Sequence, residues 1–387
     1  MKVFDLNQDL RGKRVVLRAS LNVPVASGRV ANTFRIERAL PTIEALAATG
    51  ARTTVIAHIG REKTASLAPV YEELTRRSAR RIRFAGDVLG NTARQAVAAL
   101  EDGEVLLLEN VRRAQGEIEN DDTAAKALAA YGDVYLNDAF ADSHRAHASI
   151  VGIPRHIPGF AGPNFMREYE GILPACSPES PSLGIVGGAK FGTKEPLLRH
   201  IVSTYDRVFI GGALAHDFFL AKGFEIGKSL TSRSGDVTDL LKNSKLVLPK
   251  DVVVSGADGV ETKAPADVLP ADTILDVGHA SLSTLAPHIE KARLILWNGP
   301  LGNFEQGFSA ATEALAKKVA SAAGRSVVGG GDTIAAIQNL RLMDKFTHVS
   351  TAGGAMLQFI TDGTLPGIKA LSEVHNTAAV FGGAPGR

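Results

Sequence analysis

A run of glycines that ends in aspartate and threonine, Gly329-Gly330-Gly331-Asp332-Thr333, has the clearest chemical meaning in this sequence. It follows a short apolar run, Ser326–Val328, and opens a helical pattern, Ile334–Leu340. Glycine lets backbone N–H groups approach a phosphate closely, and a helix N-terminus adds positive partial charge. An aspartate there can also hold Mg²⁺ that bridges phosphate oxygens. The simpler alternative is a tight turn with Asp332 as the helix N-cap.

Four further apolar runs in the second half of the chain end in glycine, which favours the phosphate interpretation. Their ends are Gly187-Gly188-Ala189-Lys190, Gly211-Gly212-Ala213, Asn298-Gly299-Pro300 and Ala352-Gly353-Gly354. Lys190 and Lys194 bracket the loop after the first of these runs, where an ammonium group can reach a bound triphosphate. The alternative is a pair of solvated lysines. This half of the chain therefore predicts a nucleotide-phosphate site.

The first half of the chain carries cations where the second half carries glycine. His58, Arg61, Arg112 and Arg145 follow predicted strands, and Arg35 lies near a helix start. Each of them taken alone fits an ordinary surface position. Parallel strands place their carboxyl ends at one edge of a sheet, however, so these side chains should gather there. Guanidinium groups suit a small, multiply charged anion such as a phosphorylated carboxylate.

An anion site in one half and a nucleotide-phosphate site in the other indicate phosphoryl transfer. That chemistry needs positioning and charge neutralisation more than a covalent nucleophile. A nicotinamide-dependent oxidoreductase would share the fold class. No G-x-G-x-x-G fingerprint follows the first predicted strand, which counts against that alternative.

Short β-branched apolar runs alternate with helical patterns such as Phe34–Ala47, Leu214–Ala221 and Ala310–Ala322. This alternation predicts βαβ units and parallel sheets. The arginines at Arg76–Arg77 and Arg80–Arg83 follow helical spacing, so we expect them on a solvated face. The strands that we expect are Arg14–Leu17, Thr53–Ala57, Val105–Leu108, Val134–Leu136, Leu183–Val186, Arg207–Ile210, Leu294–Trp297, Ser326–Val328 and Thr347–Ser350.

Composition places the chain among ordinary globular proteins. It has 387 residues, of which 45% are hydrophobic and 22% charged, which is enough for two or three domains with real cores. The net charge of +2 is too weak to indicate nucleic acid or an anionic membrane as a partner. The apolar runs are too short to span a bilayer, and we expect no signal peptide. The single cysteine, Cys176, excludes an intrachain disulfide and fits a reducing cytoplasm.

The sequence resembles the phosphoglycerate kinase family over about residues 3–371. The resemblance is specific, because many short motifs match in order and in spacing. The matching segments are Leu21-Asn22-Val23-Pro24, Arg35-Ile36, His58-Ile59-Gly60-Arg61, Leu106–Arg112, Asn137-Asp138-Ala139-Phe140, His144–Ser149, Gly187–Lys190, Trp297–Gly302, Gly329–Asp332 and His348–Thr351.

The resemblance implies an α/β fold with two doubly wound, Rossmann-like parallel-sheet domains joined by a hinge helix. The Pro- and Gly-rich region Pro154–Pro181, with a helix expected at Asn164–Leu173, fits the boundary. We expect a 3-phosphoglycerate-binding domain at 1–165, a hinge helix or linker at 166–179 and a nucleotide-binding domain at 180–365. The segment 366–387 would return toward the first domain, with a frayed tail.

The implied activity is reversible phosphoryl transfer between 1,3-bisphosphoglycerate and MgADP, a step of glycolysis and gluconeogenesis, by a cytoplasmic monomer. Arg35, Lys190 and Lys194 would be catalytic, with Arg35 stabilising charge on the transferring group. The residues similar to the family's substrate site are Ser20, Leu21, Asn22, Arg35, His58, Ile59, Gly60, Arg61, Arg112 and Arg145. Those similar to its nucleotide site are Lys190, Lys194, Gly211, Gly212, Gly278, Asn298, Glu305, Gly330, Gly331, Asp332 and Thr333, with Asp332 as the Mg²⁺ ligand.

Ser20 is the main departure from the family pattern. The pattern before Leu21 is Arg-Val-Asp, whereas this chain reads Arg18-Ala19-Ser20, and the family's aspartate contacts the glycerate and helps to orient the basic cluster. Ala141-Asp142-Ser143 also differs from the common Gly-Thr-Ala. A catalytically weakened kinase-like protein that still binds nucleotide is therefore the alternative to an active kinase.

Overall fold

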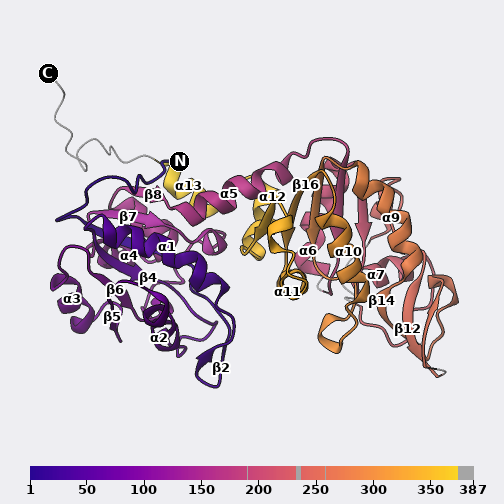
Figure 1. Ribbon diagram of the computed structural model, residues 1–387, viewed down its shortest axis with the longest axis horizontal. Coiled ribbons are helices and arrows are strands. Elements are labelled where there is room, and N and C mark those ends of the chain that lie inside the picture. Colours follow the sequence, from indigo (N-terminus) through magenta and orange to yellow (C-terminus); the bar gives the residue numbers. More distant parts are fainter. Residues whose placement is uncertain (190, 232–236, 258, 374–387) are drawn as a thin grey trace. The chain divides into compact units, whose positions relative to one another are not determined.

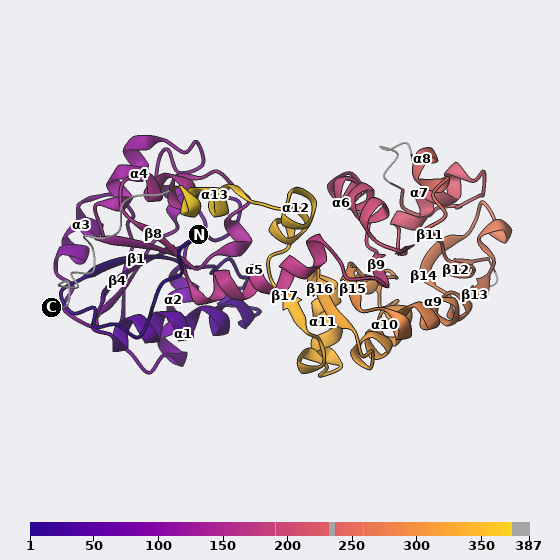
Figure 2. The ribbon, with the colours of Figure 1, turned by 90° about the horizontal axis from the view of Figure 1, so that it is seen from above.

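The computed structural model describes residues 1–189, 191–231, 237–257 and 259–373. The chain forms two compact units (Figures 1 and 2). The first contains Met1–Tyr169 and the segment from Thr364, and the second contains Glu170–Gly363. Helix α5 (Pro163–Cys176) contributes residues to both units. No helix within the described ranges is long and apolar enough to cross a lipid bilayer.

The first unit is built on a parallel six-stranded sheet in the order β5-β6-β4-β1-β7-β8. Its strands are β1 (Arg14–Arg18), β4 (Arg52–Ile56), β5 (Ile82–Ala85), β6 (Val105–Leu108), β7 (Val134–Asn137) and β8 (Gly159–Ala161). A short hairpin, β2 (Val25–Ala26) and β3 (Arg29–Val30), precedes the first helix. The helices are α1 (Phe34–Ala48), α2 (Ala68–Arg77), α3 (Asn91–Ala98), α4 (Asp122–Ala129) and α13 (Pro366–Ser372).

Helices cover both faces of this sheet. Apolar side chains of α1 and α2, including Ile43 and Leu74, pack with Val15 and Leu17 of β1 into one buried core. In Figure 2, α1 and α2 lie on one side of the sheet and α4 and α13 on the other. Such burial contributes about 25 cal/mol per Å² of apolar surface and fixes the strand ends on which the site depends.

The second unit repeats the plan with a parallel sheet in the order β11-β10-β9-β15-β16-β17. Its strands are β9 (Ser182–Val186), β10 (Arg207–Ile210), β11 (Leu246–Val247), β15 (Leu294–Asn298), β16 (Arg325–Gly329) and β17 (His348–Ser350). An antiparallel sheet adds β12 (Val252–Gly256), β13 (Gly259–Lys263) and β14 (Thr273–Val277). The helices are α6 (Phe191–Thr204), α7 (Leu214–Ala221), α8 (Thr238–Leu241), α9 (His279–Lys291), α10 (Ala310–Ala320), α11 (Gly331–Asn339) and α12 (Gly354–Asp362).

The predicted fold class is confirmed, and each of the nine predicted strands is present. The helical spacing predicted for Arg80–Arg83 is wrong, because Ile82–Ala85 forms the edge strand β5 and only Arg76 and Arg77 lie on a helix, but Arg80 and Arg81 are exposed as predicted. Ile82 and Ala85 are buried at the ends of this four-residue strand, so its pattern is too short to separate from a helical one. The tail expected beyond residue 373 lies outside the described residues.

Candidate active site

The cationic site of the first unit forms at the carboxyl edge of its sheet. Arg18 is the last residue of β1 and pairs in register with Ile56 of β4 and Asn137 of β7. His58 follows β4, and Arg112 lies in a 3₁₀ turn, Val111–Arg113, directly after β6. The segment after β7 supplies further members of the site. Parallel strand order thus brings together side chains from distant parts of the sequence.

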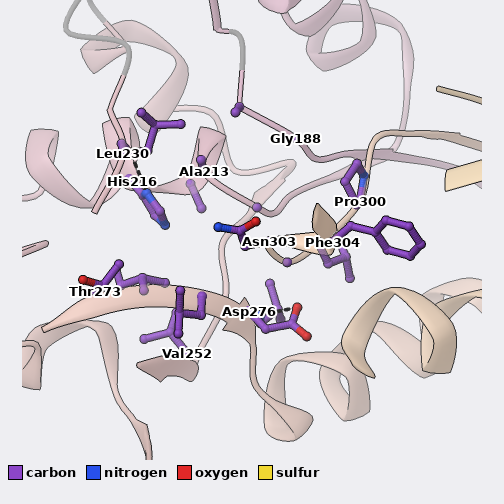
Figure 3. A pocket seen from close by; sticks show the side chains of 18 of the residues that line it. Gly188, Ala213, His216, Leu230, Val252, Thr273, Asp276, Pro300, Asn303 and Phe304 are labelled. Atoms are coloured by element: carbon purple, nitrogen blue, oxygen red, sulfur yellow. Dashed lines mark hydrogen bonds between the residues drawn. The ribbon is translucent and has the colours of Figure 1, made fainter. Parts of the chain in front are cut away.

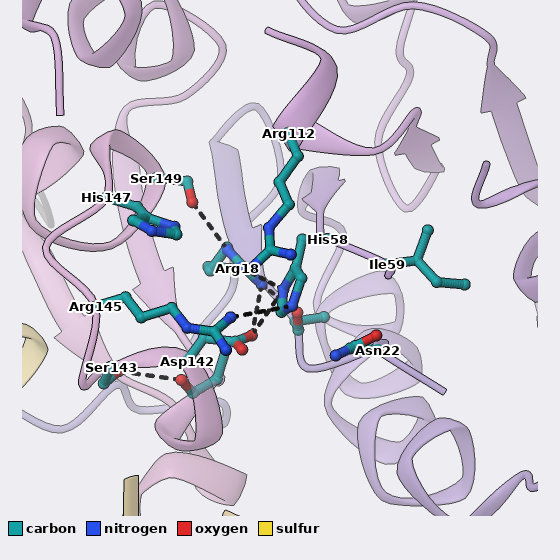
Figure 4. Close-up of polar contacts among 12 residues, drawn as sticks. Arg18, Asn22, His58, Ile59, Arg112, Asp142, Ser143, Arg145, His147 and Ser149 are labelled. Atoms are coloured by element: carbon teal, nitrogen blue, oxygen red, sulfur yellow. Dashed lines mark hydrogen bonds and ion pairs between the residues drawn. The ribbon is translucent and has the colours of Figure 1, made fainter. Parts of the chain in front are cut away.

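Arg18 is the buried centre of this cluster, with only 1% of its surface exposed. One of its terminal nitrogens, Nη2, lies 3.2 Å from Nδ1 of His58, and its Nε donates to Oγ of Ser149 at 3.1 Å. Its other terminal nitrogen, Nη1, lies 3.2 Å from a carboxylate oxygen of Asp142 (Figure 4). Nε2 of His58 lies 3.4 Å from Nη1 of Arg145. The side chains therefore form one continuous polar network.

The electrostatic state of the network follows from burial and close charges. Burial would raise the pKa of Asp142, but His58 and Arg18 together hold it well below its usual range. The fixed charge of Arg18 favours the ionised carboxylate whichever form His58 takes. Burial lowers the pKa of His58, and Asp142 opposes that shift. Burial and the neighbouring Arg145 lower the pKa of Arg112.

Most substrate-site residues predicted from the sequence meet at this edge. Oδ1 of Asn22 accepts from the backbone N–H of Gly60 at 3.0 Å, and the Asn22 carbonyl accepts from Arg35 at 2.7 Å. Arg112 donates to the carbonyl of Gly60. Arg61 is exposed.

The other residues predicted for the substrate site make no side-chain hydrogen bond to the cluster among the described residues. Leu21 and Ile59 are buried apolar side chains, so they position the backbone rather than offering a polar group. Oγ of Ser20 is buried and has no hydrogen-bond partner within the described ranges.

Sequence reasoning did not select four buried members of the network as site residues, namely Arg18, Glu117, Asp142 and Ser149. Glu117 accepts both the N–H and the hydroxyl of Ser149, at 2.9 and 2.6 Å, and burial raises the pKa of Glu117. Two features of the sequence could have identified part of this network. Arg18 ends an apolar run, and Asp142 departs from the family pattern.

In the second unit, glycine-rich strand ends interlock through backbone hydrogen bonds. The N–H of Gly187 donates to the Asn298 carbonyl at 2.9 Å, and that of Gly188 to the Pro300 carbonyl at 2.8 Å. Gly211 follows β10, and its N–H donates to the Val186 carbonyl at 2.8 Å. These contacts hold the carboxyl ends of β9, β10 and β15 in one backbone-lined surface.

Lys194 lies in α6 and points back to these strand ends. Its ammonium donates to the carbonyl of Gly187 and lies 3.5 Å from that of Asn298. Burial lowers the pKa of Lys194 to about 8, against the charge of Asp332, which raises it. Lys190, the other predicted lysine, lies outside the described residues.

A cavity of about 400 Å³ opens beside the glycine-rich ends (Figure 3). Gly188, Gly212 and Asp332 contribute to its polar side, together with Glu305. The apolar wall includes Phe219 of α7, Val252, Ile274 and Leu275 of the antiparallel sheet, and Leu230 from the segment after α7. Such a wall suits a planar, apolar ring next to a polar phosphate region. Sequence reasoning missed this wall because it did not predict β12 to β14.

Gly278 and Asn298 are among the predicted members of the site that do not line the described cavity. Gly278 is the N-cap of α9, and its N–H donates to the Asp251 carbonyl at 3.0 Å. A Cβ added at Gly278 would lie 2.2 Å from the Asp251 carboxyl group, so a larger residue there would force that side chain to move.

The glycine run after β16 forms a helix N-terminus. Gly330, with φ of 107°, is the N-cap of α11, and Gly331 begins the helix. Asp332 lies in the first turn and is exposed, so the alternative in which it is the N-cap is wrong. Oγ1 of Thr333 is buried and has no hydrogen-bond partner within the described ranges.

These residues fit a Mg²⁺–phosphate group. A carboxylate is a ligand that Mg²⁺ uses when phosphates and waters complete its shell, and the first backbone N–H groups of a helix, which have no partner within the helix, suit the phosphate. Within the described ranges no group of three or more His, Cys, Asp or Glu side chains forms a metal cage. Asp332 would hold the ion and Thr333 a phosphate oxygen.

Replacing Gly212 with alanine is expected to destabilise the second unit by about 1–3 kcal/mol. Gly212 has φ of 60°, and an added Cβ would lie 2.7 Å from the Gly188 nitrogen and 2.9 Å from the Pro300 oxygen. Denaturant unfolding measures the effect. Gly192→Ala is the control, because it meets no atom within 4 Å and lies in α6, where alanine is favoured. Equal stability of the two variants would contradict the close approach.

Two parallel α/β units, one with a buried cation cluster and one with a glycine-lined cavity, fit the class of enzymes that transfer phosphoryl groups between small molecules. The phosphoglycerate kinase family model matches residues 4–363. A phosphoglycerate kinase of Rhizobium leguminosarum bv. trifolii is 42% identical over 97% of this chain and 99% of its own length.

Solved structures agree. The structure of phosphoglycerate kinase from Coxiella burnetii has a TM-score of 0.82 and 38% identity, covering 95% of this chain and 98% of its own. The enzyme from Pyrococcus horikoshii has a TM-score of 0.86 and 30% identity, covering 96% of this chain and 98% of its own. This chain belongs to the phosphoglycerate kinase family.

Proposed function

We propose that this chain is an active phosphoglycerate kinase that transfers a phosphoryl group between 1,3-bisphosphoglycerate and MgADP, giving 3-phosphoglycerate and MgATP. The observation that carries the proposal is the pairing of two different anion sites in one chain of this family. One is a network of cations, and the other combines a cavity, a lysine and a glycine-rich helix start. The oxidoreductase alternative has no support from the family assignment.

In the first unit, the cations hold 3-phosphoglycerate or the acyl phosphate. Asn22, His58, Arg61, Arg112 and Arg145 bind its charged groups, while Ser20, Leu21, Ile59 and Gly60 shape the backbone around it. Arg35, held by the Asn22 carbonyl, is available to neutralise charge on the transferring group. Guanidinium forks are suited to both carboxylate and phosphate oxygens.

In the second unit, the apolar wall of the cavity takes the adenine ring, and Glu305 binds the ribose. The phosphates lie against the backbone of Gly211, Gly212, Gly330 and Gly331, and the N-terminus of α11 donates to them. Lys194, with Lys190, neutralises the transferring group, and Gly278 and Asn298 support the loops. Bound Mg²⁺ would neutralise phosphate charge. Transfer between ligands on different units requires a closed state that excludes water, as the hinge of the family implies.

Steady-state turnover of 3-phosphoglycerate with MgATP, in an assay coupled to 1,3-bisphosphoglycerate formation, tests the proposal. We expect turnover that saturates with both substrates. ATP hydrolysis that does not depend on 3-phosphoglycerate would refute it. Nothing within the described ranges or among these relatives favours the weakened kinase that Ser20 suggested. We further propose a cytoplasmic monomer, for which size-exclusion chromatography with light scattering tests the oligomeric state.

Chelation of divalent metal is expected to abolish turnover, and Asp332→Asn to raise the Mg²⁺ concentration for half-maximal rate roughly 10-fold or more. The amide loses the charge that draws the ion to the helix start. A Mg²⁺ titration at fixed ATP measures the shift. Asp344→Asn, an exposed carboxylate in the turn after α11, is the control and should leave the titration unchanged. An identical curve for Asp332→Asn would exclude it as the ligand.

A further inference from the structure

The carboxylate of Asp142 lies inside the cation cluster rather than at its rim. Asp142 ends a 3₁₀ turn, Phe140–Asp142, after β7, and its residue surface is 4% exposed. Its Oδ2 lies 3.2 Å from Nη1 of Arg18 and 3.4 Å from Nδ1 of His58. In Figure 4 these three side chains converge, with Arg145 beside them. A single carboxylate therefore contacts two of the site's buried bases.

A buried charge of this kind fixes geometry. Removing one partner of a buried ion pair leaves the other charge uncompensated, which is far more costly than at the surface. Arg18 is held on its other side by Ser149, which Glu117 anchors in turn. Asp142 completes the set of contacts around the Arg18 guanidinium, and through His58 it reaches Arg145.

Ser20 lies at the same edge of the sheet as Asp142 but carries no charge. Ser20 leaves the same edge of the sheet two residues after Arg18, and its Oγ is buried without a hydrogen-bond partner among the described residues. β1 and β7 are neighbours, so the segments that carry Ser20 and Asp142 emerge side by side. Among the described residues, the site thus has a buried hydroxyl without a hydrogen-bond partner after β1, and after β7 a carboxylate whose Oδ2 is held by ion pairs rather than by a hydrogen bond.

We propose that Asp142 is a positioning residue of the 3-phosphoglycerate site, which holds Arg18 and His58 and takes over the orienting role of a carboxylate at position 20. The proposal rests on the proposed function for the identity of the ligand. The proposal explains both departures from the family pattern, at Ser20 and at 141–143. The negative charge that the family carries at position 20 is carried here by Asp142. The basic cluster keeps its carboxylate, which offsets repulsion among its cations before the substrate binds.

Isothermal titration calorimetry with 3-phosphoglycerate tests the role of Asp142 without turnover. We expect Asp142→Asn, which keeps the volume and removes the charge, to weaken binding roughly 10- to 100-fold. The KM for 3-phosphoglycerate should rise in parallel, with the KM for MgATP unchanged. Asp133→Asn is the matched control, because Asp133 pairs with Arg14 at 2.7 Å at the opposite end of the same two strands. It should bind 3-phosphoglycerate like the parent.

A variant that moves the carboxylate from position 142 to position 20 distinguishes a positioning role of Asp142 from a role in overall stability. Ser20→Asp added to Asp142→Asn should recover at least about a third of the lost affinity. Ser20→Asp in the parent should give no gain, because the cluster already holds the carboxylate of Asp142. If Asp142→Asn does not fold, the double variant is compared directly with Ser20→Asp. Unchanged binding in Asp142→Asn, or the same effect of Ser20→Asp in both backgrounds, would overturn the proposal. Loss of turnover with normal 3-phosphoglycerate binding would instead count against the proposed function.

Discussion

Replacing Lys194 with alanine is expected to lower kcat by about 10²- to 10³-fold at saturating substrates, the usual cost of losing one preorganised group that stabilises transition-state charge. Lys194 is already held by the Gly187 carbonyl next to the glycine-rich strand ends, so little reorganisation is needed when a phosphate arrives. The loss should fall mainly on kcat, because the ammonium acts most strongly on the transferring group. Stopped-flow or steady-state turnover measures it.

The pH dependence of the same residue gives a second readout. Burial lowers the pKa of Lys194 to about 8, so the free enzyme loses this positive charge as pH rises through 8. The ratio kcat/KM for the nucleotide should therefore fall above that pH. In Lys194→Arg the charge persists, and this limb should disappear. Lys317→Ala, on the exposed face of α10, should match the parent in both rate and profile. A Lys194→Ala variant within threefold of the parent would contradict the assignment.

Arg35→Ala is expected to reduce kcat by a similar factor of about 10²–10³. Arg35 lies in the first turn of α1, and its guanidinium donates to the Asn22 carbonyl at 2.7 Å, which orients it at the edge of the cation cluster. The KM for MgATP should change little, because the nucleotide site lies on the other unit. Arg35→Lys should recover only part of the rate, since a point charge replaces a planar fork.

Arg38→Ala is the control for Arg35. Arg38 lies one turn further along α1 and stacks on the Phe34 ring at 5.0 Å. The same helix thus carries two arginines, of which Arg35 donates to the Asn22 carbonyl and Arg38 stacks on a ring. Equal losses in the two variants would show that the effect comes from the helix rather than from the site.

The fold could be predicted from the sequence because its strands are buried on both faces and read as short apolar runs. The strand Leu294–Asn298 is wholly buried, and the predicted strand Leu294–Trp297 covers all but its last residue. Prediction failed where this signal weakens. Arg83 lies in an edge strand, and its Nη1 lies 3.3 Å from Glu104, so charged residues interrupt the apolar pattern. Glu261 lies in the exposed strand β13, which is equally hard to separate from a loop.

The cation site could be predicted in part for a related reason. Parallel strands bring their carboxyl ends together, so the shared placement of His58 and Arg112 after strands was informative. Arg18 was missed because an arginine at the end of a strand reads as exposed. Its burial depends on Ser149 and Asp142, more than a hundred residues away in the chain. Partnerships over such distances leave no local sequence signal.

The most direct test of the central claim is label transfer from [γ-³²P]ATP to 3-phosphoglycerate in the presence of Mg²⁺. The account predicts that label enters an acyl phosphate, which hydroxylamine destroys, and that Lys194→Ala and Arg35→Ala transfer little of it. Label that appears only as inorganic phosphate, or no transfer from the parent chain, would contradict it.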